Sequence, residues 1–157
     1  MANAEYPFTT FNFYVMLTIA NADGLGVSNP LCKMEFAELD GLEMSMEPKT
    51  VREGGNNLQQ VNLVGHVSYN TLTLKRGMTS NLDLWKWFAA AAGSTGRSRR
   101  ASGVILVRDA AGHTRVRYKL SGCLPVKIKA PALNAKDGGI AIEEIQIAVN
   151  SFTVEGP

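Results

Sequence analysis

An alternation of apolar and polar residues with a period of two recurs along most of this chain, and it restricts the fold more than any other feature. In the clearest case, over residues 11–19, Phe, Phe, Val, Leu and Ile occupy every second position. The same period marks residues 42–46 and 114–120. Because successive side chains of a β-strand point to opposite faces, each segment is predicted to be a strand with one apolar face.

The last apolar segment, residues 140–154, changes phase twice. Its isoleucines first stand at even positions, the apolar residues then move to odd positions, and they return to even ones at the end. A period of two does not survive such changes without an extra residue in the strand. We therefore predict β-bulges near Glu143-Glu144 and near Asn150-Ser151.

One segment, residues 81–92, has the period of a helix. Ser80 is predicted to cap it, Asp83 stands three positions later, and Gly93 follows as a stop. The predicted core-facing stripe consists of Leu84, Trp85, Phe88 and Ala92. Trp87 lies off that stripe, which leaves two interpretations: it packs against a loop of its own chain, or it is an exposed anchor for a partner.

Residues 43–61 interrupt the apolar pattern. The part from Glu47 to Gln60 is polar and contains the pair Gly54-Gly55, which favours a turn. This segment is predicted to be a long β-hairpin that projects from the body, because its middle has too few apolar residues to pack inside. The chain as a whole is predicted to be one domain over residues 1–157, mainly β with one α-helix. Its sheets would form either two packed antiparallel layers or a partly open β-barrel flanked by the helix.

Composition and motifs argue against an enzyme. The net charge is +2, from 16 Lys and Arg against 14 Asp and Glu, so a strongly basic nucleic-acid-binding or membrane-surface protein is not indicated. Two histidines (His66, His113) and two cysteines (Cys32, Cys123) show no metal-ligand or CxxC spacing. No phosphate-binding loop or nucleophile motif occurs. We expect no catalytic residue, cofactor, metal or small-molecule substrate.

The segment 94–102 is a small, polar, basic loop with three arginines, Arg97, Arg99 and Arg100. Such a loop is usually solvated surface, and no aromatic residues are interleaved for base stacking. A nucleic-acid-binding β-barrel that uses these arginines is retained as an alternative from another functional class. No apolar run is long enough to span a bilayer, and the N-terminal residues lack the pattern of a secretion signal, so the chain is expected to start in the cytoplasm.

Several short motifs follow one another in a fixed order along most of the chain. They are Leu39-Asp-Gly-Leu-Glu43, Val51-Arg-Glu-Gly-Gly-Asn56, Leu63-Val-Gly65, Leu72-Thr-Leu-Lys-Arg-Gly77, Leu84-Trp-Lys-Trp87, Gly122-Cys-Leu-Pro-Val126, Ala130-Pro-Ala-Leu-Asn134 and Ile142-Glu-Glu-Ile145. Each motif alone is weak, but the ordered set resembles the tail tube family of contractile phage tails and related contractile injection systems.

The resemblance implies a structural inner tube subunit. In this family, homohexameric rings stack into a hollow tube that a sheath encloses and drives into a target cell envelope. The implied partners are further copies of the chain, a sheath protein, baseplate and cap proteins, and protein cargo or DNA in the lumen. Assembly is expected in the bacterial cytoplasm, and the product is a phage tail or an injection particle. A baseplate-proximal tube initiator or a terminator with the same fold is the alternative.

The resemblance also assigns the projecting hairpin to contacts with neighbouring subunits and the next ring. The residues expected there are Glu47, Arg52, Glu53, Gly54, Gly55, Asn56 and Asn57. A second candidate surface is a cationic strand face, Arg115, Arg117 and Lys119. It would either line the lumen or pair across subunits with carboxylates such as Glu143 and Glu144. Pairing is favoured, because stacked rings repeat any unbalanced charge in every layer.

Overall fold

A computed structural model describes residues 12–20, 31–34, 36–55, 58–93, 99–136 and 138–156, without the side chains of residues 32–34. Within these ranges the chain forms twelve strands and one helix. They are β1 (Asn12–Ile19), β2 (Cys32–Met34), β3 (Glu38–Asp40), β4 (Met44–Met46), β5 (Lys49–Val51), β6 (Val61–Leu63), β7 (Val67–Tyr69), β8 (Leu72–Gly77), α1 (Asp83–Gly93), β9 (Ala101–Arg108), β10 (Thr114–Lys129), β11 (Ile142–Ala148) and β12 (Ser151–Glu155).

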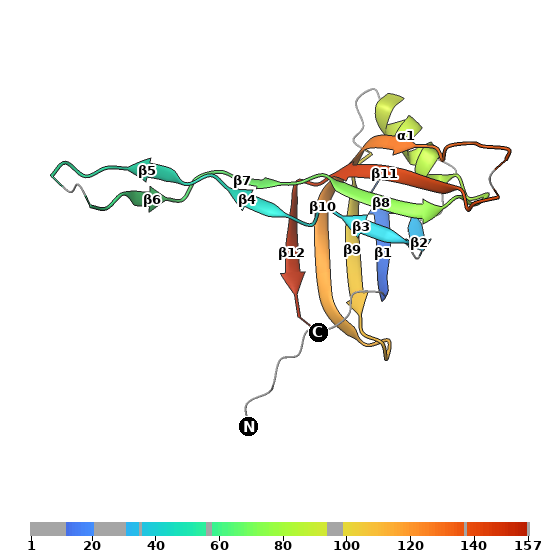
Figure 1. Cartoon of the computed structure of the whole chain (residues 1–157), viewed down its shortest axis with the longest axis horizontal. Coiled ribbons are helices and arrows are strands. Elements are labelled where there is room, and N and C mark those ends of the chain that lie inside the picture. Colours follow the sequence, from blue (N-terminus) through green and yellow to red (C-terminus); the bar gives the residue numbers. More distant parts are fainter. Residues whose placement is uncertain are drawn as a thin grey trace.

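The body of the molecule consists of two antiparallel layers that share strand β10. The first layer has the order β2-β1-β9-β10-β12, and the second has the order β10-β11-β8-β3. In Figure 1 the strands β3, β8 and β11 run across those of the first layer. The sheets are not closed into a barrel. The predicted class, mainly β with one helix, is confirmed, and packed layers are the architecture that forms.

Strand β10 changes layer at Gly122. The φ angle of Gly122 is +65°, in the left-handed region, and the register against β9 shifts between Leu120 and Cys123. A Cβ atom at this position would lie 2.2 Å from the side-chain nitrogen of Asn150. Arg100 closes the corner by donating hydrogen bonds to the carbonyl of Gly122 (3.2 Å) and to Oδ1 of Asn150 (3.3 Å). Glycine is required here for both its backbone conformation and its lack of a side chain.

Apolar side chains from both layers form one core. The predicted apolar face of β1 is confirmed at Val15, Leu17 and Ile19, all of which are buried. The other members of the core are Leu31, Phe36, Leu72, Leu74, Leu84, Trp87, Ala101, Ile105, Leu120, Cys123, Ile145, Ile147 and Phe152. Because these side chains come from both layers and from α1, their burial holds the helix and the two sheets together.

Helix α1 begins two residues later than predicted, and its cap differs. The side chain of Asn81, and not that of Ser80, accepts a hydrogen bond from the backbone N–H of Asp83 (3.0 Å). Asn81 is itself held by its own N–H, which donates to the hydroxyl of Thr79 (3.2 Å). An asparagine carbonyl two residues before the first helical amide reaches that amide easily, which explains the choice of cap.

The predicted bulge at Glu143-Glu144 is wrong. Strand β11 pairs with β8 in continuous register from Ile142 to Ile147. Inward positions alternate without interruption, and Glu143 occupies the first of them while Ile142 is about half exposed. The apparent change of phase arises because Glu143 occupies an inward position that a polar residue rarely takes, while its neighbour Ile142 points outward.

The second predicted irregularity, at Asn150-Ser151, does occur, but as a break between strands. Strand β11 ends at Ala148 in the second layer, and β12 begins at Ser151 in the first. Because the chain turns here from the second layer to the first, the alternation of inward and outward side chains starts again in β12. A bulge that the sequence did not indicate lies in β10, between Pro125 and Lys127, where the register against β11 shifts.

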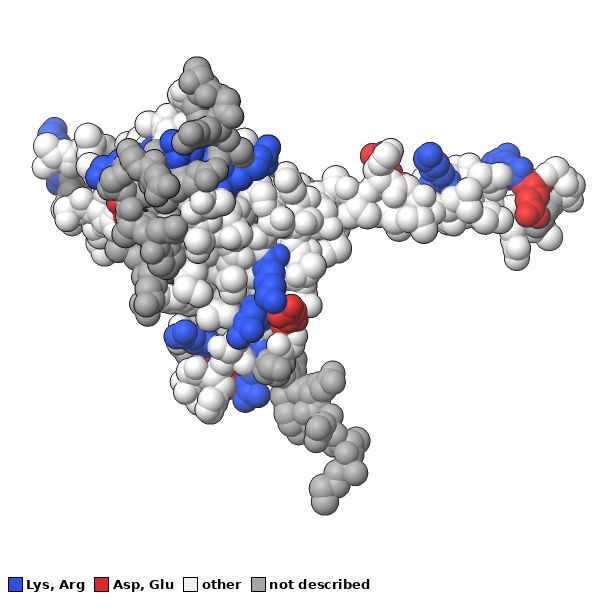
Figure 2. Space-filling view, turned by 180° about the vertical axis from the view of Figure 1, so that it is seen from behind, with Lys and Arg blue, Asp and Glu red and all other residues white. Residues whose placement is uncertain are grey.

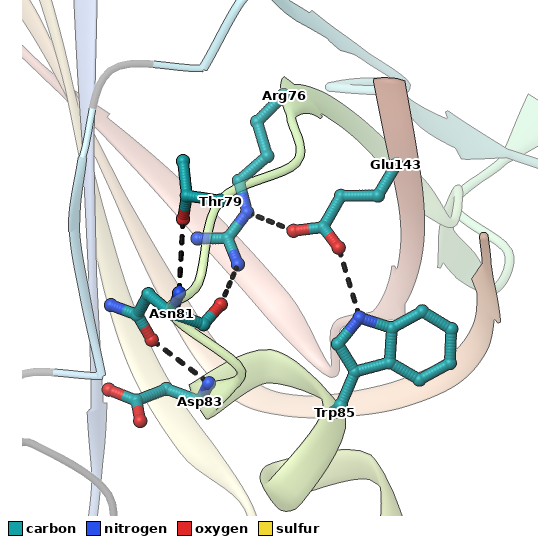
Figure 3. Close-up of polar contacts among 6 residues, drawn as sticks. All are labelled: Arg76, Thr79, Asn81, Asp83, Trp85 and Glu143. Atoms are coloured by element: carbon teal, nitrogen blue, oxygen red, sulfur yellow. Dashed lines mark hydrogen bonds and ion pairs between the residues drawn. The ribbon is translucent and has the colours of Figure 1, made fainter. Parts of the chain in front are cut away.

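Glu143 is buried because it faces Arg76 directly across the β8–β11 pair. Both residues are only 3% exposed, and Nε of Arg76 donates to Oε1 of Glu143 (Figure 3). Oε2 of Glu143 accepts a hydrogen bond from Nε1 of Trp85 (3.0 Å), and Nη2 of Arg76 donates to the backbone carbonyl of Asn81 (3.1 Å). The buried ion pair thus ties α1 and the turn that precedes it to the second layer.

The turn between β9 and β10 is organised by Asp109. Its Oδ1 accepts the backbone N–H groups of Ala111 (2.9 Å) and His113 (3.0 Å), and its Oδ2 accepts Nε of Arg115 (2.7 Å). The hydrogen bond from the His113 amide, supported by Arg115 and Ala111, lowers the pKa of Asp109 below its ordinary value. The turn therefore depends on an ionised carboxylate.

We predict that Arg76→Met alone costs about 3–5 kcal/mol of unfolding free energy, because it leaves the Glu143 carboxylate buried without its counter-ion. The double variant Arg76→Met/Glu143→Leu should recover most of that loss, since no buried charge remains. Guanidinium chloride unfolding of the wild type and the single and double variants measures both values. Equal losses in the single and double variants would contradict the assignment.

A second prediction concerns acid. Because the pKa of Asp109 is lowered in the folded state, its stabilisation of the turn is complete above the unfolded carboxyl pKa of about 3.9 and is lost as pH falls through the lower folded value. The amide resonances of Ala111 and His113, followed by NMR from pH 7 to 2, should shift with a midpoint below about 3.9. In Asp109→Asn this transition should be absent. A midpoint at or above the unfolded value would refute the assignment.

Candidate assembly interface

The most distinctive surface of the molecule is a long β-hairpin that leaves the body. Two short ladders build it: β4 pairs with β7 next to the body, and β5 pairs with β6 farther out. Figure 1 shows the hairpin extending far beyond both layers. The prediction of a projecting hairpin is confirmed, but the predicted segment 43–61 is too short, because the returning arm continues to Tyr69.

The hairpin narrows where the two ladders meet. The backbone of Gly65 lies so close to the facing arm that a Cβ atom would overlap the carbonyl oxygen of Glu47. The N–H of Glu47 donates to the carbonyl of His66 (3.1 Å) at the same point. Two residues separate the ladders on one arm and three on the other, as in a β-bulge. Glycine therefore allows the two arms to approach closely at this point.

The expected contact residues lie on the exposed outer part of the hairpin. Glu47, Arg52, Glu53, Gly54 and Gly55 are all exposed, and the predicted turn at the glycine pair is present, with φ of +92° at Gly55. Asn56 and Asn57 lie outside the described residues. Arg52 and Glu53 lie at the tip. Within the part of the chain that the structure describes, neither of them forms an ion pair, so both can contact another molecule.

The shaft of the hairpin is more apolar than its sequence indicated. Eight of its large apolar side chains are between 41% and 95% exposed. They are Met44, Met46, Val51, Leu58, Val61, Leu63, Val64 and Val67. Figure 2 shows a few charged side chains of both signs spread along the projection, while most of the face in view is uncharged. Cross-strand register was the missing information, because it pairs Val51 with Val61 and Met46 with Val67.

Trp87 is not an exposed anchor. Its side chain is fully buried, and its Nε1 donates a hydrogen bond to the backbone carbonyl of Arg99 (2.7 Å). The alternative interpretation, packing within its own chain, is therefore the one that the structure supports. The helical wheel misplaced the core face because α1 carries apolar residues on nearly all sides, and the buried positions are Leu84 and Trp87.

The cationic strand face is the outer side of β10. Arg115, Arg117 and Lys119 are exposed and alternate with half-buried or buried residues, as predicted. Arg115 pairs with Asp109 (2.7 Å), and Lys119 pairs with Glu155 of β12 (2.9 Å), both within the same chain. Figure 2 shows cations over this lower part of the body with an acidic residue among them. The face is therefore partly neutralised before any partner binds.

The proposed acidic partners of that face divide into two cases. Glu143 is buried against Arg76 inside the body, so its assignment to a surface charge face is wrong. Glu144 is partly exposed and stands opposite Lys75 on one side and Lys129 on the other. The basic loop also divides: Arg97 lies outside the described residues, while Arg100 holds the β10 corner.

Three further observations concern metal binding, membranes and the reactivity of a thiol. In the described ranges, no group of three or more His, Cys, Asp or Glu side chains is placed to hold a metal ion. The described helix is too short to cross a bilayer. Cys123 is buried, and desolvation raises the pKa of its thiol to about 12, so at neutral pH it stays protonated.

Comparison with known proteins places the fold. A chain of the anti-feeding prophage baseplate shares 22% identity, with 98% of each chain covered and a TM-score of 0.82. A chain of the sheath-tube complex of the extracellular contractile injection system PVC shares 19% identity over 98% of this chain and 94% of that chain, with a TM-score of 0.76. Hcp1 from Salmonella typhimurium shares 14% identity over 92% and 86%, with a TM-score of 0.54.

At these identities the similarity establishes a common fold. No curated protein sequence matches the chain. The family model described as T4-like virus tail tube protein gp19 matches residues 9–153, which include nearly every strand of the body, the hairpin and α1. The chain therefore belongs to the T4-like virus tail tube protein family.

Proposed function

We propose that this chain is the repeating structural subunit of the inner tube of a contractile tail or injection system. Residues 1–157 would act as one tube domain, six copies would close a ring, and rings would stack into a hollow tube inside a sheath. Family membership supports the tube assignment. The single structural observation that carries it is the projecting hairpin, whose large apolar side chains are exposed on the surface of the isolated chain.

Leaving the hairpin exposed to water is unfavourable, which supports its burial in an assembly. Large apolar side chains exposed in a continuous group favour association, and an extended two-stranded ribbon also has unpaired edges. A contact between the hairpin of one copy and a different surface of another is head-to-tail. Such contacts close into rings or continue as open filaments, depending on the rotation between copies. A stacked tube needs both: contacts that close each ring, and contacts that continue from one ring to the next.

Size and charge are compatible with a delivery channel. A compact chain of this length has a radius of gyration of roughly 15 Å, which corresponds to a sphere about 40 Å across, and six such spheres in a ring enclose a hole of similar width. Two of the three cations on the cationic strand face, Arg115 and Lys119, are neutralised within the chain, leaving Arg117 as the charge of this face that a lumen would display. We propose protein cargo or DNA as the contents.

The proposed partners are the sheath on the outside and baseplate and cap proteins at the two ends. The similar chains come from structures described as a baseplate and as a sheath-tube complex, which supports this arrangement. Assembly would start in the bacterial cytoplasm, and the tube would then be part of a phage tail or an extracellular particle. The role is structural, with no catalytic step.

A second candidate is a tube initiator at the baseplate, since a chain from a baseplate structure is among the similar ones. Such a protein would form single rings that do not grow. A nucleic-acid-binding protein would behave differently again, since the unassembled chain would bind duplex DNA with an affinity that falls steeply with salt.

Electron microscopy of the purified protein, concentrated stepwise, separates these candidates. We expect six-membered rings and hollow tubes with a lumen on the order of 40 Å. Rings without tubes would favour the initiator. A protein that stays monomeric at all concentrations, or that binds DNA as a monomer, would overturn the proposal.

Shortening the hairpin tests its role directly. Replacing residues 48–65 with Asn-Gly keeps the β4–β7 ladder and closes it with a two-residue turn between Glu47 and His66. Because the removed residues lie outside the core, the melting temperature should stay within a few degrees of the wild type, while tubes disappear. Normal tubes from this variant would show that the outer hairpin is not an assembly element.

A further inference from the structure

An apolar cleft lies on the body at the opposite end of the long axis from the hairpin. The cleft has a volume of about 810 Å³ and is lined by residues 131–135 and 139–141 of the connection between β10 and β11 and by Ile142 of β11, with Pro131, Leu133, Ile140 and Ile142 as its large apolar members. Leu133 is 90% exposed, and Ile140 is 86% exposed. In Figure 1 this connection closes the end of the body that faces away from the hairpin.

The walls of the cleft are held in place. The N–H of Met78, at the end of β8, donates to the carbonyl of Ala141 (2.8 Å), and the side chain of Asn134 accepts the N–H of Lys136 (3.0 Å) in a local turn. Ile142 is in β11 and paired with Gly77. The cleft is thus anchored to the second layer on one side and shaped by a side-chain-stabilised turn on the other.

The chemistry of the cleft favours an apolar occupant. Among the described residues, those that line it, 131–135 and 139–142, carry no charge. Beside it lies a smaller hollow with Lys75, Lys129 and Glu144, in which Lys129 faces Glu144 across the strands and Lys75 pairs with Glu38 (3.5 Å). Since these flanking charges are balanced, neither a nucleic acid nor an acidic peptide finds a surplus of cations there.

The outer ladder of the hairpin matches these requirements. Its register puts Val51 opposite Val61 and Leu63 opposite Lys49, so one face of the ribbon presents three apolar side chains, each 41–48% exposed, with Lys49 at one end of the same face. Leu58 and Val64 nearby are 95% and 80% exposed. Being farther from the body than the β4–β7 ladder, this part of the hairpin is the best placed to reach another molecule.

We propose that the apolar face of the β5–β6 ladder of one copy docks in the cleft of residues 131–142 of a second copy. This inference rests on the proposed tube function and adds the receiving surface. Donor and acceptor lie at opposite ends of one chain (Figure 1), so one pair of surfaces repeats without limit from copy to copy. Burial of both apolar groups drives the contact, and the long side chain of Lys49 keeps its ammonium group in water at the rim.

Intermolecular cross-linking tests the pairing. Leu63→Cys and Leu133→Cys are made in separate chains, each with Cys32→Ser, and the two preparations are mixed before assembly and treated with a short bismaleimide. Cys123 does not interfere, because it is buried and its raised pKa keeps the thiol protonated. The matched control replaces Leu133→Cys with Leu82→Cys, at an exposed apolar position (46%) outside both surfaces.

We expect the yield of the 63–133 link, identified by mass spectrometry, to exceed the 63–82 link at least tenfold in assembled material. Tubes that form while the 63–133 link is no more abundant than the control would overturn this inference and leave the tube function intact. If the wild type forms neither rings nor tubes, the proposed function itself fails, and the two failures are thereby distinguished.

A charge in the cleft provides a second readout. Ile140→Glu should raise the protein concentration needed for half-maximal assembly at least tenfold, whereas Leu82→Glu should change it less than twofold. Both side chains are exposed in the isolated chain, so melting temperatures should match the wild type. Unchanged assembly of Ile140→Glu, or equal effects of the two substitutions, would refute the cleft as the receiving site.

Discussion

Strand β10 is paired in both layers, and this double membership determines where every other element can lie. Its first part pairs with β9 and β12, and its last part pairs with β11. The change of layer needs a residue that accepts a positive φ and leaves room for Asn150, and Gly122 meets both requirements. Because β11 and β12 then pair with different parts of the same strand, the chain must break between them at Asn150. The hairpin leaves the body from β3 and returns to β8 in the second layer, so its direction also depends on this corner.

The ion pair between Arg76 and Glu143 solves a different problem. The helix must be fixed against the second layer at a place where its first turn still has unsatisfied backbone groups. A buried pair is costly unless its remaining hydrogen-bonding atoms are satisfied. Here Trp85 and the carbonyl of Asn81 supply partners from the helix and its leading turn. Apolar residues in both positions would pack as well but would not specify the position of the helix through directed bonds, which is a reason for the pair to be there.

The surface of the molecule carries an unusual number of exposed apolar side chains. Many of the large ones lie on the thin hairpin, and several more lie around the cleft. In an isolated protein this distribution would promote aggregation. In an assembling protein it separates the two tasks: the core stabilises the subunit, and the hairpin and cleft are free to contact other copies. The acidic and basic residues of the body are largely balanced within the chain, so association does not have to overcome strong repulsion between copies.

How much the sequence alone predicts depends on whether the deciding contacts are local. Alternation predicted β1, β4 and the first part of β10, the glycine pair predicted the turn of the hairpin, and the helix was predicted to within two residues, because each of these depends on neighbours in the chain. The placement of Trp87 off the core stripe was wrong because an almost uniformly apolar helix has no single core face, and its packing within the chain, one of the two open interpretations, depends on the carbonyl of Arg99 outside the helix. Glu143 was misjudged because its inward position is stable only opposite Arg76, which lies 67 residues away in the chain. Local periodicity and turn chemistry therefore determined the class of fold and the presence of a projection. Which residues are buried, which charges neutralise one another and which end of the body carries the cleft were decided only by tertiary pairing, since those energies depend on cross-strand register between distant segments.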